Sequence, residues 1–89
     1  MSTPEWIEAK LRAALTPDHL EVIDESARHV GHAGARRGGG HFQVVIVSER
    51  FRGQTRLERH RAVYDALGDA MRDRIHALTL RALTPDEWK

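Results

Sequence analysis

The fold is decided by residues 41–83, HFQVVIVSERFRGQTRLERHRAVYDALGDAMRDRIHALTLRAL, where two apolar runs flank a helical pattern. The run at 41–48 is rich in β-branched residues and predicts a strand, and the run at 75–83 predicts another. Helical spacing between them predicts a helix over 55–72. It relates four apolar residues: Leu57, Tyr64, Leu67 and Met71. Because a strand–helix–strand connection normally joins parallel strands, both strands should start at the same edge of one sheet.

Further elements lie on either side of this stretch. Apolar residues recur every three to four positions and predict a helix over 4–15. A short β-rich run at 20–23 predicts a strand that forms a hairpin with 41–48. The capping signature at 84–87, TPDE, predicts a short final helix at Trp88. The resulting order, α-β-β-α-β-α, indicates the α+β class and one domain over residues 1–89.

Composition narrows the classes of function. The chain has 89 residues, no cysteine and a formal net charge of +1. Without cysteine there is no disulfide, thiolate nucleophile or thiolate ligand from this chain. No apolar run approaches the roughly 20 residues that span a bilayer, so we expect a cytoplasmic protein without a membrane partner. No acid, base and nucleophile can be grouped from their spacing, and we expect no enzyme.

Histidines form the first candidate site. Residues 27–42, ARHVGHAGARRGGGHF, carry His29, His32 and His41 in a glycine-rich connection. If the strands at 41–48 and 75–83 are parallel, His76 begins its strand at the edge where this connection emerges. Histidines that are distant in sequence would then lie close together.

Arginines form the second candidate site. Between positions 50 and 61 the sequence has five arginines and one acidic residue, Glu58, which gives the segment a net charge of +4. They are Arg50, Arg52, Arg56, Arg59 and Arg61. The cluster could contact nucleic-acid phosphates, or it could be a solvated helix face.

Several motifs in this order resemble the BolA family. They are an HF-led strand, a serine followed by F-x-G, R-H-R-x-V-Y, I-H-A-L and T-P-x-E-W. The likeness extends back through LEVIDES and covers nearly the whole chain. It implies a BolA-like, type II KH-like fold, with helices packed on one face of a three-stranded mixed sheet.

The resemblance also implies a function. BolA-like proteins associate with monothiol glutaredoxins, and the pair can hold a bridging [2Fe-2S] cluster with thiolates from glutaredoxin and glutathione. The ligands on the BolA side would be His76 and a loop histidine, with His29 favoured over His32. Imidazole ligands lower the negative charge of such a cluster and raise its potential. On its own, the protein is expected to be a monomer or a weak homodimer.

Other interpretations stay open for individual residues. His76 could be a strand-end histidine bonded to a carbonyl, and His41 fits a role in pairing with the backbone or orienting the loop. His60 fits packing or hydrogen bonding, and His19 a solvated strand entrance. Some BolA relatives act as transcriptional regulators, so DNA binding by the arginine cluster is the alternative function. RNA binding of the KH type is not favoured, because Gly53 has no glycine three residues away.

Overall fold

The computed structural model describes residues 3–25, 40–68 and 75–88. Within these ranges two α-helices, one 3-10 helix and three strands follow one another along the chain. They are α1 (Thr3–Leu15), β1 (His19–Asp24), β2 (Gly40–Val47), η3 (Glu49–Phe51), α2 (Arg56–Leu67) and β3 (Ile75–Leu83). No helix in the described ranges is long and apolar enough to cross a membrane.

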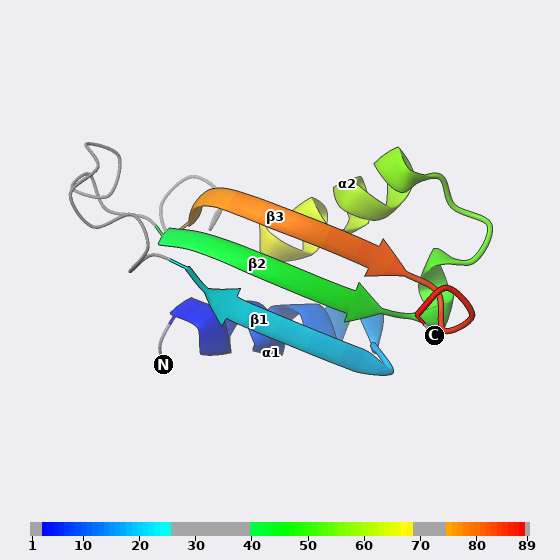
Figure 1. Cartoon of the computed structure of the whole chain (residues 1–89), viewed down its shortest axis with the longest axis horizontal. Helices are drawn as coiled ribbons and strands as arrows, with labels where there is room; N and C mark the ends of the chain where they lie inside the picture. The colour runs from blue at the N-terminus through cyan, green and yellow to red at the C-terminus, as the bar shows by residue number, and fades with distance from the viewer. Residues whose placement is uncertain (1–2, 26–39, 69–74, 89) are drawn as a thin grey trace.

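The strands form one mixed sheet in the order β1-β2-β3 (Figure 1). β1 and β2 are antiparallel, which confirms the predicted hairpin. β2 and β3 are parallel, which confirms the arrangement inferred from the strand–helix–strand order. The starts of β2 and β3 therefore share one end of the sheet, and β1 ends there.

Both helices cover the same face of the sheet, as predicted (Figure 1). Alternate residues of β2 are directed to this face and are almost fully buried: Phe42, Val44 and Ile46. On α1, Ile7 and Leu11 are four residues apart and have no exposed surface. Burying one such side chain contributes about 1.5–3 kcal/mol. The helical and strand periodicities thus meet in one core.

Helix α2 is shorter than predicted. It begins after Thr55, whose side chain accepts a hydrogen bond from the Glu58 N–H, while Glu58 accepts one from the Thr55 N–H. It ends before Gly68, which has a φ of 56° that favours glycine. The predicted end at residue 72 is therefore wrong, and residues 69–72 lie outside the described ranges.

The predicted final helix is also wrong within residues 84–88. The chain makes a turn in which the N–H of Glu87 donates to the Thr84 carbonyl over 3.0 Å. The Glu87 carboxylate accepts a hydrogen bond from the Thr84 N–H over 2.8 Å. Residues 84–87 of the capping signature thus form a turn, with hydrogen bonds between its first and last residues.

Candidate functional site

The common end of the three strands gathers segments that are far apart in sequence. Gly40 pairs with Ile75, and His41 pairs with Ala77. The N–H of Glu25, just after β1, donates to the His41 carbonyl over 2.7 Å. The backbone of His41 thus joins β2 to the residue that follows β1.

A register shift lies at His76. One step along β2, from Gly40 to His41, matches two steps along β3, from Ile75 to Ala77. His76 is the additional residue of this β-bulge. Bulges are common next to functional sites, where they re-aim a side chain.

The structure describes only some residues of the predicted histidine site. The backbones of His76 and His41 lie at the same end of the sheet, as the parallel arrangement predicts. His29 and His32 lie outside the described residues. Among the residues that are described, no group of three or more His, Asp or Glu side chains could hold a metal ion.

The arginine cluster divides into engaged and unengaged residues. Arg52 forms ion pairs with Glu49 at 2.7 Å and with Asp86 at 3.0 Å, and these raise its pKa. The Nε of Arg50 donates to the Thr16 hydroxyl over 3.0 Å. In the described part of the chain, the side chains of Arg56 and Arg61 make no hydrogen bond or ion pair.

Arg59 is the most enclosed member of the cluster, with a side chain only 14% exposed. It donates to the carbonyls of Gln54 and Ala82, both over 3.1 Å. It also pairs with Glu87 at 2.6 Å. The hydrogen bonds from Arg59, followed by that from the Thr84 N–H, lower the pKa of Glu87 to about 2. Arg59 therefore joins α2, β3 and the C-terminal turn.

These contacts change the charge balance read from the sequence. Five arginines and Glu58 gave +4 between positions 50 and 61. The fold adds three carboxylates that pair with two of these arginines: Glu49, Asp86 and Glu87. The net charge of the five arginines together with these four carboxylates is then +1. Much of the cluster therefore stabilises this end of the fold.

Two other histidines have partners on the protein. The His60 ring contacts Tyr64 edge to face, with ring centroids 6.4 Å apart, in line with the packing role expected. Burial, and then the charge of Arg56, lower the pKa of His60. His19 begins β1, as expected, and its side chain is 38% exposed. Its ring also has partners on the protein, because it stacks on Trp88 at 4.7 Å and its Nε2 lies 2.6 Å from Glu21. Trp88 is 69 positions away from His19, and no local sequence signal relates them.

Fold and register together define a small α+β domain with a mixed three-stranded sheet backed by two helices. The family described as BolA-like protein matches residues 11–87. The chain belongs to the BolA family, which confirms the resemblance read from its motifs.

Relatives match over most of the chain. The DNA-binding transcriptional regulator BolA of Escherichia coli (strain K12) is 47% identical over 89 residues, covering 100% of this chain and 82% of that protein. BolA-like protein 1 of Mus musculus is 43% identical over 83 residues, covering 93% of this chain but 58% of the longer mouse protein. The solved BolA domain of SufE1 from Arabidopsis thaliana is 41% identical, with a TM-score of 0.85 over 98% of this chain and 96% of that domain.

Proposed function

We propose that this protein is a non-enzymatic adaptor that binds a monothiol glutaredoxin and helps to hold or pass on a [2Fe-2S] cluster bridging the two proteins. The observation that carries the proposal is the parallel pairing of β2 and β3. It brings the start of the strand containing His76 to the end of the sheet where the connection containing His29 and His32 enters β2. Family membership supplies the expectation of this partner and cluster.

The donor set of the chain fits such a cluster. The chain has six histidines and no cysteine, so it can contribute imidazole nitrogen, a ligand that suits iron, but no thiolate. Glutaredoxin and glutathione would contribute the thiolates. When bound, the cluster supplies one-electron chemistry at a potential raised by nitrogen ligands. The role of this chain is to present His76, with His29 or His32, to the partner, and a cytoplasmic setting keeps the required thiols reduced.

Reconstitution tests the proposal directly. The purified chain is mixed with a monothiol glutaredoxin, glutathione, iron and sulfide, and visible absorption and circular dichroism are recorded. We expect a spectrum distinct from that of the glutaredoxin homodimer, together with a 1:1 complex on size exclusion. A spectrum identical to that of the homodimer, with no complex, would contradict the adaptor function.

DNA binding is the second candidate function, favoured by the 47% identity to a relative named as a DNA-binding transcriptional regulator. Ion pairs engage Arg52 and Arg59, so phosphate contacts should come from the other arginines of the cluster. Replacing Arg56 or Arg61 by Ala should reduce the slope of log affinity against log salt by about 0.9 each. Arg52→Ala is the matched control and should change the slope little. Equal slopes for all variants would exclude this surface.

A further inference from the structure

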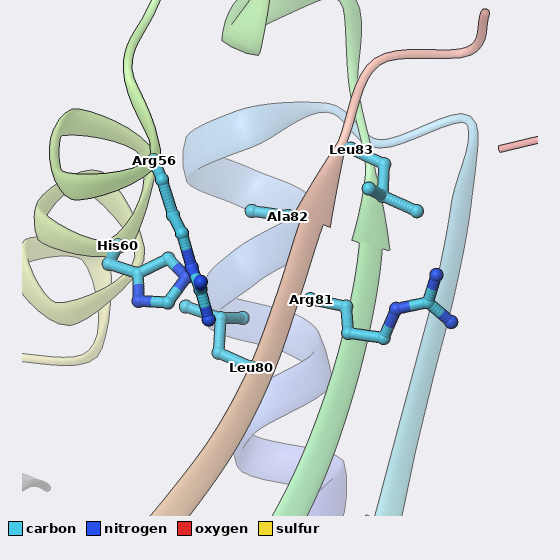
Figure 2. A pocket seen from close by; sticks show the side chains of 6 residues that line it. All are labelled: Arg56, His60, Leu80, Arg81, Ala82 and Leu83. Atoms are coloured by element: carbon cyan, nitrogen blue, oxygen red, sulfur yellow. The ribbon is translucent and has the colours of Figure 1, made fainter. Parts of the chain in front are cut away.

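A small pocket opens between α2 and the outer edge of β3 (Figure 2). Its volume is about 190 Å³, and both charged and apolar side chains surround it. The residues that line it are Arg56, His60, Leu80, Arg81, Ala82 and Leu83. None of these residues belongs to the histidine site proposed above.

Arg56 supplies an uncommitted positive charge to this pocket. Figure 2 shows the side chains of Arg56 and His60 directed from α2 toward Leu80, while the Arg81 side chain extends to the other side of β3. Within the described ranges Arg56 has no carboxylate or carbonyl partner, in contrast to Arg52 and Arg59. A guanidinium can bind a carboxylate through two parallel hydrogen bonds.

The edge of β3 adds backbone groups to the same side. The Leu83 carbonyl accepts a hydrogen bond from the Ser48 N–H over 2.9 Å, so Leu83 is bonded on the β2 side. In a parallel ladder alternate residues are directed to the opposite side. The backbone groups of Leu80 and Ala82 therefore face the pocket. The Ala82 carbonyl already accepts a hydrogen bond from Arg59, so this part of the edge is already occupied by a side chain.

The charge on the pocket suits a monoanion. Because the pKa of His60 is lowered, its ring is mostly neutral at pH 7 and offers one N–H donor without adding charge. Arg56 then supplies the positive charge on this side of β3, beside the apolar side chain of Leu80. A group with one negative charge and a planar pair of oxygens matches this combination.

We propose that the pocket between α2 and β3 binds a single carboxylate group, held by the Arg56 guanidinium with His60 beside it. The carboxylate could belong to a small free acid or to an acidic side chain of a partner. Both have the same chemistry, and the experiment below separates them.

Titration followed by NMR tests the site on the whole chain. Acetate and the peptide acetyl-Gly-Glu-Gly-amide are added at constant ionic strength, with the Gln peptide as the uncharged comparison. We expect saturable shifts of the His60 ring and Leu80 methyl resonances in the millimolar range. Tighter binding of the Glu peptide identifies a partner's side chain as the ligand, and binding by acetate alone identifies a small acid.

Two arginines of α2 provide the matched pair of variants. Arg56→Ala should weaken binding about tenfold or more, because a charge-assisted hydrogen bond is lost. Arg61→Ala removes the same charge outside the pocket and should bind like the wild type. The proposal would be overturned if neither acetate nor the Glu peptide gave saturable shifts, if the uncharged Gln peptide bound as tightly as acetate or the Glu peptide, or if both variants lost binding equally.

Discussion

The two ends of the sheet differ in their polar residues: arginines of the cluster lie at one end, and His41 and His76 lie at the other. The C-terminal turn lies at the end of the sheet where β2 and β3 finish (Figure 1). Ion pairs and hydrogen bonds of Arg52 and Arg59 join η3, α2 and this turn. At the end where β2 and β3 start, the Glu25 N–H donates to the His41 carbonyl, and the strand pairing shifts its register at His76.

This difference changes the interpretation of the arginine cluster and of the histidines that the sequence suggested. In the sequence the arginines resemble a binding surface, whereas the fold uses two of them, Arg52 and Arg59, to hold its own C-terminal turn. The histidines are separated in sequence, whereas the topology brings two of their strands together. The following predictions test whether one end is functional and the other structural.

The largest effect is expected at the histidine end. His76→Ala should weaken retention of the bridged cluster by about 10- to 100-fold as a lower bound, the range for disturbing ligand surroundings. Visible circular dichroism of the mixture with glutaredoxin measures the loss over time. His60→Ala, on α2, is the control and should retain the cluster. An unchanged signal and lifetime for His76→Ala would make His76 a structural residue and remove the contrast between the ends.

A smaller effect is expected at the arginine end, on folding. Arg59→Ala removes hydrogen bonds to Gln54, Ala82 and Glu87, and should lower the free energy of unfolding by about 1–2 kcal/mol. Arg61→Ala should stay within about 0.5 kcal/mol of the wild type, because exposed residues without contacts contribute little. Urea unfolding measures both variants. Equal stabilities would show that Arg59 does not hold this end together.

The smallest effect depends on pH. The pKa of Glu87 falls from 4.5 to about 2 on folding, so its contribution is present above pH 4.5 and is lost as pH falls toward 2. Glu87→Gln should therefore be less stable than the wild type at pH 7, and the difference should narrow on acidification. Unfolding curves at several pH values measure it. Glu8→Gln, in an exposed pair on α1, is the control and should show little difference at any pH. A constant gap for Glu87→Gln would refute the linkage.

Local pattern was enough to predict most of the fold. β3 was predicted at 75–83 and is found there. The parallel pairing followed from the handedness of crossovers. The end of α2 was missed because Met71 continues the helical spacing, whereas Gly68 ends the helix.

The site was less accessible to sequence reasoning. The partners of Arg52 and Arg59 in the C-terminal turn are 34 and 28 positions away, so the local charge count could not include them. The stacking of His19 on Trp88 has the same origin. The participation of His29 and His32 stays a prediction.

The bulge at His76 means that β3 has one residue more than its pairing with β2 requires. Ile75 is 3% exposed in the core, although it is an odd number of positions from Leu78 and Leu80, which belong to the same face. The additional residue permits this by resetting the alternation of the strand. Deleting His76 would leave Ile75 and Ala77 as successive residues opposite Gly40 and His41, in an unbroken ladder. A chain one residue shorter could therefore form the same strand pairs. The residue at position 76 is thus not required for strand pairing, and its identity can be determined by function.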